Sequence, residues 1–485
     1  MNNTKTTKRA LLSSVVAMLV CITMLIGTTF AWFTDSASTA VNKIQAGTLD
    51  VQLLAEDGVT SIEGGMLKWK KAASATADTS SNTTESEEVL WEPGCTYNLE
   101  SFMIKNNGNL ALKYKIVISG IAGDAKLNEA IVWSYKLADG TDFPITSEGH
   151  LLAGANTGLI TISGHMKEDA GNEYQGLSID GIGITVIATQ DTVEHDSNNN
   201  QYDANAEYPA IVSTAADIRN AVEQGKANVL LTEDITIDDG IQIGVKNDTA
   251  INFNGNTLKG AVESGSISSS DGPTNLVLSD PNNSGEYSID SNIVAHEGGG
   301  YTQLSAITVW KPTVTVESGK YTHDNAVILC QLQTQDPNAV GVVINGGTFD
   351  GKGAASVIAN VFGSVIVNNG EFNAHYDGES SGECVYVSSG NSYVPSVTTI
   401  NGGTFNADKR IFFVRVNTSY TQKIVVNGGT FNVAEGGSLI QVSSGNASDY
   451  LTITGGTFNV DPSAYVDTAN YDITHSGSTW TVTAK

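Results

Sequence analysis

The sequence predicts a mainly β protein with two folded parts: an N-terminal jelly-roll or β-sandwich domain, followed by a right-handed parallel β-helix. Charged residues make up only 16% of the 485 residues, and the chain contains 50 glycines. Such a composition favours short strands joined by tight turns over long surface helices. In addition, an eight-residue motif recurs along the second half of the chain, and this repeat predicts the β-helix.

The charge balance limits the partners of the chain. The sequence has 52 acidic against 25 basic side chains and a formal net charge of −27. Nucleic acids and anionic lipid surfaces both favour clustered Lys and Arg. We therefore expect neither as the main partner.

The first 31 residues have the pattern of a secretory signal peptide. Lys5, Lys8 and Arg9 precede an uncharged apolar run over residues 10–27. Small residues at Thr29 and Ala31 then predict cleavage between Ala31 and Trp32 by a signal peptidase, and hence a secreted or cell-surface protein. The alternative is a permanent membrane anchor, because the run is almost long enough to cross a bilayer.

Residues 32–208 are expected to form the first domain. Apolar alternation and spacing predict antiparallel strands packed as a sandwich or jelly roll. The predicted strands are Gly47–Leu54, Tyr97–Asn106, Leu112–Ile118, Ala130–Leu137, Leu159–Gly164 and Ile182–Thr189.

A linker and a short capping helix are expected over residues 209–225. Thr214 followed by Asp217 is the pattern of a capping box, the helix is predicted over Ala215–Gln224, and Gly225 ends it. We expect this helix to cover the first open edge of the β-helix, which is assigned to residues 226–485.

The repeat itself predicts strand, turn and core. Its clearest copies read VVINGGTF (342–349), VIVNNGEF (365–372), TTINGGTF (398–405), IVVNGGTF (424–431) and LTITGGTF (451–458), and VTVESGKY (314–321) is a looser relative. Period-two aliphatic residues predict a strand that buries one face, and the Asn-Gly pair after it predicts a turn. One unit is too small to bury its apolar face alone, so stacked copies must share a core.

The residues that recur at the turn and after it are expected to be structural. In a stacked repeat, equivalent rings lie inside and equivalent amides hydrogen-bond along the corner, so these residues serve the stack and not a ligand-binding stripe. They are Asn345, Phe349, Asn368, Phe372, Asn401, Phe405, Asn427, Phe431 and Phe458.

Several short motifs in the first part resemble the TasA/camelysin family of secreted matrix proteins from Gram-positive bacteria. The matching segments are the leader ending in residues 27–33, AGTLDV (46–51), WEPG (91–94), IKNNGNLAL (104–112) and ATQ (188–190). The resemblance, over about residues 10–208, implies a jelly roll, export through a dedicated signal peptidase and assembly into biofilm fibres. In such fibres a strand at about Trp32–Leu54 would enter the next subunit or another matrix protein.

The second half resembles the pectin-lyase-like β-helix superfamily, which includes glycan-active enzymes and bacterial adhesins. Three interpretations remain open: a non-catalytic structural protein of the biofilm matrix or cell surface, a secreted polysaccharide lyase or glycoside hydrolase, or a glycan- or host-binding adhesin without turnover, which grades into the first. The best polar concentration for catalysis comprises His323, Asp324, the segment 375–379 and Glu383. A carboxylate pair there would serve as acid and base, and otherwise these residues form a solvated loop.

The resemblance to camelysins raises the question of a metal site, because camelysins are classed as metallopeptidases. The chain has no H-E-x-x-H motif and its seven histidines are scattered, so we expect no zinc. Calcium is a weak hypothesis, which rests on part of an EF-hand loop pattern in Asp196, Asn198, Asn200 and Glu207. Gln201 replaces the usual glycine, and an acidic linker explains the same residues.

The cysteines imply no disulfide framework. Outside the leader they are Cys95, Cys330 and Cys384, an odd number spread widely along the chain. Cys330 and Cys384 either meet between stacked segments or lie buried as small apolar residues.

Overall fold

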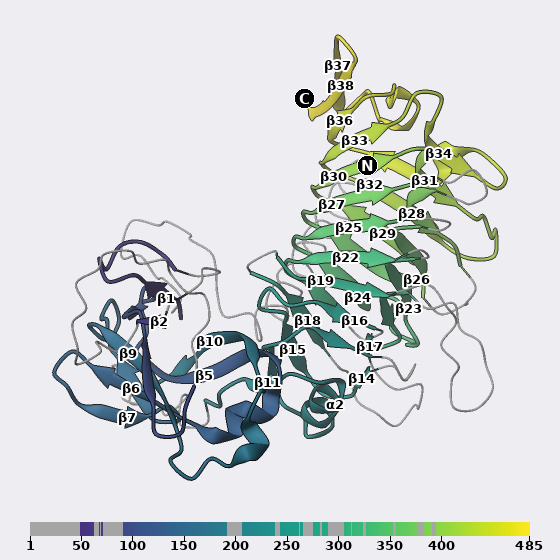
Figure 1. Cartoon of the computed structure of the whole chain (residues 1–485). Helices are drawn as coiled ribbons and strands as arrows, with labels where there is room; N and C mark the ends of the chain where they lie inside the picture. Colours follow the sequence, from purple (N-terminus) through teal and green to yellow (C-terminus); the bar gives the residue numbers. More distant parts are fainter. Residues whose placement is uncertain are drawn as a thin grey trace, which may run out of the picture. The chain divides into compact units, whose positions relative to one another are not determined.

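The structure is a computed structural model. It describes residues 49–62, 67, 69–70, 91–191, 206–237, 243–260, 262–264, 275–281, 284–289, 305–311, 313–323, 326–352, 356–376, 382–389 and 394–485. The chain divides into two compact units, and the boundary lies between Pro209 and Ala210. Each unit is described by itself, and Figure 1 shows the elements of both.

The first unit is built from antiparallel strands. Two larger sheets have the strand orders β2-β3-β9-β6-β7 and β10-β5-β8, and a third pairs β1 with β4. The strands are β1 (Val51–Leu54), β2 (Trp69–Lys70), β3 (Thr96–Leu99), β4 (Met103–Asn106), β5 (Leu112–Gly123), β6 (Ile131–Leu137), β7 (Asp142–Pro144), β8 (Glu148–Leu151), β9 (Ile160–Met166) and β10 (Ile179–Gln190). Short 3₁₀ turns cover Ala125–Ala130 and Asn172–Tyr174.

One hydrophobic cluster fills this unit. Tyr114 from β5, Trp133 and Tyr135 from β6, and Ile160 and Ile162 from β9 all belong to it and are buried. Strand β9 shows why the sequence folds this way: its buried and half-buried residues alternate strictly along seven positions. Both larger sheets therefore turn one face toward a common core.

The predicted strand over Tyr97–Asn106 is instead two strands. Strand β3 pairs with β2 and β9, whereas β4 pairs with β1 in a different sheet. Between them Phe102 is fully buried and exchanges backbone hydrogen bonds with Ile160. The chain changes sheet at this point, and a continuous apolar pattern in the sequence does not reveal such a change.

The second unit begins with β11 (Ala210–Val212) and helix α2 (Ala215–Glu223). The predicted capping box is confirmed: the Asp217 amide donates to Oγ1 of Thr214, and the Thr214 amide donates to the Asp217 carboxylate. Ile218, Ala221 and Val222 on one face of α2 lie in the core of this unit. The helix therefore covers apolar residues at the start of the strand stack.

The rest of the unit is a stack of parallel strands, and the prediction of a mainly β protein is confirmed. These strands are β12 (Asn228–Leu231), β13 (Ile235–Thr236), β14 (Ile243–Val245), β15 (Thr249–Asn252), β16 (Leu258–Lys259), β17 (Val262–Ser264), β18 (Leu276–Ser279), β19 (Glu286–Ile289), β20 (Ile307–Val309), β21 (Val314–Val316), β22 (Lys320–His323), β23 (Ile328–Gln331), β24 (Val340–Ile344), β25 (Thr348–Gly351), β26 (Ile358–Val367), β27 (Glu371–Ala374), β28 (Glu383–Val387), β29 (Ser396–Ile400), β30 (Thr404–Ala407), β31 (Arg410–Val414), β32 (Gln422–Val426), β33 (Thr430–Val433), β34 (Ser438–Val442), β35 (Leu451–Ile453) and β36 (Gly456–Phe458).

The strands repeat in three parallel sets. One set contains β21, β24, β26, β29, β32 and β35 in succession, and a second contains β22, β25, β27, β30, β33 and β36. A third runs through β23, β26, β28, β31 and β34, so the long strand β26 belongs to two sets. Each of these repeats thus pairs with the next repeat along the chain, with register shifts where β26 pairs with β23 and β24.

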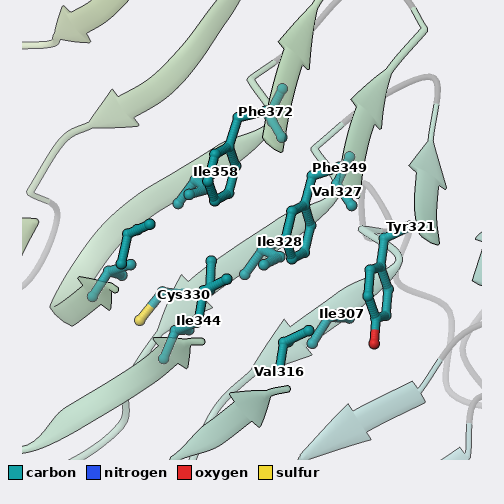
Figure 2. Close-up of a cluster of buried hydrophobic side chains, with 14 of the residues drawn as sticks. Ile307, Val316, Tyr321, Val327, Ile328, Cys330, Ile344, Phe349, Ile358 and Phe372 are labelled. Carbon is teal, nitrogen blue, oxygen red and sulfur yellow. The ribbon is translucent and has the colours of Figure 1, made fainter. Parts of the chain in front are cut away.

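Aromatic rings form a column inside this stack. Tyr321, Phe349, Phe372, Phe405 and Phe431 are fully buried, and successive ring centroids lie 5.0, 4.9, 4.5 and 5.0 Å apart with nearly parallel planes. Phe458 continues the column at 4.8 Å. Figure 2 shows Tyr321, Phe349 and Phe372 one above another, beside aliphatic residues of the other two sets.

The chain ends in antiparallel strands. Strand β38 (Thr479–Ala484) pairs with both β36 and β37 (Tyr471–Ser476). Short 3₁₀ turns precede it at Ala447–Asp449 and Ser463–Tyr465. In the part of the chain that the structure describes, no helix has the length and apolar character needed to cross a bilayer.

The three cysteines among the described residues, Cys95, Cys330 and Cys384, are free thiols. Cys330 and Cys384 are fully buried, which agrees with the interpretation as small apolar residues, whereas Cys95 is half-exposed. Burial raises the pKa of Cys330 to about 12 and raises the pKa of Cys384 still further.

We expect a thiol reagent to label only Cys95 in the native protein. The thiolate is the reactive form, and burial both blocks access to Cys330 and Cys384 and disfavours their ionisation. Iodoacetamide labelling followed by peptide mass spectrometry measures this, with urea-unfolded protein as the control in which all three react. Rapid labelling of Cys330 in the native protein would contradict the packing described here.

Candidate functional site

The recurrent asparagines form a ladder at one corner of the repeats. Nδ2 of Asn368 donates to Oδ1 of Asn345 at 2.8 Å, Asn401 donates to Asn368 at 2.8 Å, and Asn427 donates to Asn401 at 2.9 Å. Glu317 accepts from Asn345 at the lower end, and the Thr454 hydroxyl donates to Asn427 at the upper end. Each amide therefore bonds to the repeats before and after it.

The turn after each ladder residue brings backbones into close contact. Gly403 has φ +96°, and a Cβ there would lie 2.9 Å from the carbonyl oxygen of Gly370 in the preceding repeat. A side chain would have to displace main-chain atoms, and a positive φ adds strain for any residue except glycine. The glycine is therefore required by the stacking of successive turns.

The recurrent aromatic rings and asparagine amides of the repeat both make their contacts within the chain. The rings of Phe349, Phe372, Phe405, Phe431 and Phe458 lie inside, and the ladder amides bond to one another. Chemically, this arrangement holds neighbouring repeats in register.

Among the described polar residues that the sequence singled out, a histidine flanked by two carboxylates is found at His375. Its Nε2 lies 3.1 Å from a carboxylate oxygen of Asp350, and its Nδ1 lies 3.6 Å from one of Asp408. Asp350 is on β25, and the other two residues follow β27 and β30, so three successive repeats supply the group. The imidazole is 55% exposed and the Asp350 side chain is 25% exposed. This places a histidine between two acids at a wet corner of the stack.

One interpretation of the sequence places Glu383 in a solvated loop, and the structure shows that this is wrong. Glu383 lies on β28 and its side chain is 1% exposed. Its carboxylate accepts hydrogen bonds from Nε and Nη2 of Arg410 on the next repeat at 3.2 and 2.9 Å, and from the Ser356 hydroxyl at 2.9 Å. Burial raises the pKa of Glu383, and Arg410 and Ser356 offset part of that rise.

An outward-facing aromatic pair lies beside this ion pair. Tyr386 on β28 and Phe413 on β31 are register partners, and their ring centroids are 5.8 Å apart. The Arg410 guanidinium lies 4.5 Å from the Phe413 centroid and also donates to Gln441 at 2.7 Å. The sequence did not point to Arg410, because a lone arginine in a strand carries no motif. Its register with Glu383 appears only when the repeats are stacked.

Several residues proposed from the sequence lie outside the described residues: Ala31, Trp32, Asp196, Asn198, Asn200, Asp324, Asp377 and Glu379. Glu207 is described, as are His323, which is buried on β22, and the residues around His375. Within the described ranges, no group of three or more His, Cys, Asp or Glu side chains is arranged to hold a metal ion.

Comparison with known proteins gives one partial match. A family model described as camelysin metallo-endopeptidase matches residues 6–63. This N-terminal segment, which includes β1, is thus similar to camelysins, and this supports the resemblance found in the sequence. No curated protein and no solved structure matches the chain.

Proposed function

We propose that this chain is a secreted, non-catalytic structural or adhesive protein of the bacterial cell surface or biofilm matrix. Its second unit is a right-handed parallel β-helix that acts as a rigid stalk or glycan-contacting surface, and its first unit is a jelly roll. The camelysin-like match over residues 6–63 supports export after cleavage at Ala31. Calcium binding by Asp196, Asn198, Asn200 and Glu207 remains a prediction.

The observation that carries a structural role is the use of the repeated residues. The ring column and the asparagine ladder join each repeat to the next, and parallel strand pairing runs from β11 to β36. Such a stack is stiff along its length because every repeat is fixed by its two neighbours.

Strand exchange between subunits is supported by the edge that β1 occupies. In the described part of the chain, β1 pairs with β4 in a two-stranded sheet, and an isolated bridge joins Leu54 to Ser61. Asn107 extends the pairing with β4, because its amide and its side chain both donate to Asp50. Asp50 and Asn107 belong to two of the camelysin-like motifs. The same edge of β4 accepts a β1 strand equally well from its own chain or from a second copy.

Electron microscopy of the mature protein tests this assembly. We expect fibres from the chain that begins at Trp32, and none after deletion of Trp32–Leu54. Leu54→Asp, which charges a side chain that is 5% exposed, should also abolish fibres. Val59→Asp is the matched control, because Val59 is 82% exposed. Fibres that survive the deletion unchanged would refute strand exchange.

A second function, polysaccharide cleavage, is favoured by one observation: His375 lies between Asp350 and Asp408 on successive repeats. Incubation of the mature protein with plant, host and bacterial glycans, with assay of new reducing ends and of unsaturated products, separates the two functions. The structural proposal expects no release. Release that is lost in Asp350→Asn and Asp408→Asn, with Asp449→Asn as an exposed control, would replace it with an enzyme.

A further inference from the structure

The sequence contains six Asn-Gly pairs, which in general are the dipeptides most prone to spontaneous deamidation. Their asparagines are Asn107, Asn254, Asn345, Asn369, Asn401 and Asn427. In this reaction the following amide nitrogen attacks the side-chain carbonyl carbon, so the side chain must be free to rotate toward the backbone.

Three of the six are held by the ladder. Asn345, Asn401 and Asn427 each donate through Nδ2 to the repeat below and accept at Oδ1 from the repeat above, over 2.8–3.0 Å. Rotation toward the backbone would break both bonds. Exposure alone does not protect them, because Asn401 and Asn427 are solvent-exposed.

The pairs at Asn107 and Asn254 are held in another way. Nδ2 of Asn107 donates to the Asp50 carboxylate, and the nucleophilic amide of Gly108 donates to Oδ1 of Asn106. At the second pair, the Gly255 amide donates to the Asp280 carboxylate at 2.7 Å. In both pairs the attacking nitrogen is engaged in a hydrogen bond.

Asn369 differs from the other five. In this copy of the eight-residue motif the turn reads NNG in place of NGG, and Asn368 takes the ladder position. Asn369 therefore stands where other copies have glycine, at Gly346, Gly402 and Gly428. Asn369 is exposed, and within the described part of the chain its side chain makes no hydrogen bond. Its main-chain amide has only a long bond, 3.4 Å, to the Ile344 carbonyl.

We propose that Asn369 is a site of spontaneous covalent modification, in which it converts to aspartate and isoaspartate. The Gly370 nitrogen loses its proton and bonds to Cγ of Asn369, the Cγ–Nδ2 bond breaks, and ammonia leaves with that proton. Solvent water then opens the succinimide at either carbonyl. The product adds a carboxylate to an exposed corner two residues from Glu371, and the isoaspartate form adds one methylene to the main chain there.

Peptide mapping by mass spectrometry tests this on the native full-length mature protein, aged in mildly alkaline buffer at physiological temperature. Methylation by an isoaspartate-specific methyltransferase gives a second readout. We expect Asn369 to deamidate roughly tenfold or more faster than Asn401 and Asn427, about the factor expected for ordinary hydrogen bonds that must break first. Urea-unfolded protein, in which all six pairs should react at similar rates, is the reference.

Two variants sharpen the test. Asn369→Gly restores the NGG turn and should remove the fast phase. Asn368→Ala deletes the hydrogen-bond acceptor of Asn401 and should speed deamidation at Asn401. Asn427 keeps its acceptor, Asn401, and Asn107 is outside the ladder, so the deamidation rates at these two residues should not change. If Asn368→Ala does not fold, the comparison of native and unfolded wild type still decides. Equal native rates at Asn369, Asn401 and Asn427, or an intact Asn369 when the unfolded chain reacts, would overturn the proposal.

Discussion

Replacing Arg410 by Met should destabilise the protein by about 3–5 kcal/mol, the usual cost of leaving one partner of a buried ion pair uncompensated. Glu383 is 1% exposed and Arg410 is 8% exposed, so water cannot replace the lost partner. Urea denaturation followed by circular dichroism measures the change. The double variant Glu383→Leu/Arg410→Met should recover most of the loss, because it removes the buried charge altogether.

The destabilisation caused by Arg410→Met should also depend on pH. Burial already raises the pKa of Glu383, and without Arg410 the Ser356 hydrogen bond and the Lys409 charge oppose that rise more weakly. A carboxyl that binds its proton more tightly in the folded state contributes its stability at low pH, and the contribution is lost as pH rises through the folded pKa. The defect should therefore be smaller in acid than at neutral pH.

Arg415→Met is the control for this substitution. Arg415 follows the same strand but is solvent-exposed, so its replacement should change the free energy of unfolding by less than about 0.5 kcal/mol. Equal effects at Arg410 and Arg415 would show that the Glu383 pair is not buried as described.

Truncation of Phe405 to Ala should cost a similar amount, about 3–5 kcal/mol. The Phe405 ring is fully buried between Phe372 and Phe431, with centroids 4.5 and 5.0 Å away. The variant leaves a cavity in a dense core and also breaks both stacking contacts, each of which is worth about 0.5–1.5 kcal/mol. Urea denaturation again provides the measurement.

Phe458→Ala and Phe413→Ala are matched comparisons for the column. Phe458 stacks on only one described column ring, Phe431, so its loss should be smaller than that of Phe405. Phe413 faces outward and should cost least. If the three truncations were equally destabilising, the interior column would not be a main support of the stack.

Local patterns fixed much of the second unit. Aliphatic residues alternate with other residues in the eight-residue motifs, so these segments form strands with one buried face, as β24 and β29 show. Thr214 and Asp217 set the start of α2 because a capping box involves only neighbours in sequence. The strands of the first unit were harder to predict, because the change of sheet between β3 and β4 depends on partner strands far away in the chain.

The candidate site was less accessible from sequence than the fold. The sequence indicates a concentration of polar residues around 375–383, but it does not distinguish two different environments. His375 lies near Asp350 and Asp408 at a solvent-exposed corner. Glu383 is buried against Arg410. These pairs join residues about 25–33 positions apart, and their distances depend on the exact register between repeats. Single-residue charge patterns carry no information on that register.

By itself, the sequence determined that this protein is β-rich, that its second half is built from repeats, and that Phe and Asn recur at equivalent positions. These features depend on side-chain alternation and turn preference, which act over a few residues. Only the tertiary structure decided which side chains meet: the hydrogen bonds from Asn345 through Asn427, the burial of Glu383 with Arg410, and the side-chain amide of Asn369, which has no hydrogen-bond partner among the described residues. These contacts arise between repeats, where one added or missing residue in a turn changes which partners face each other.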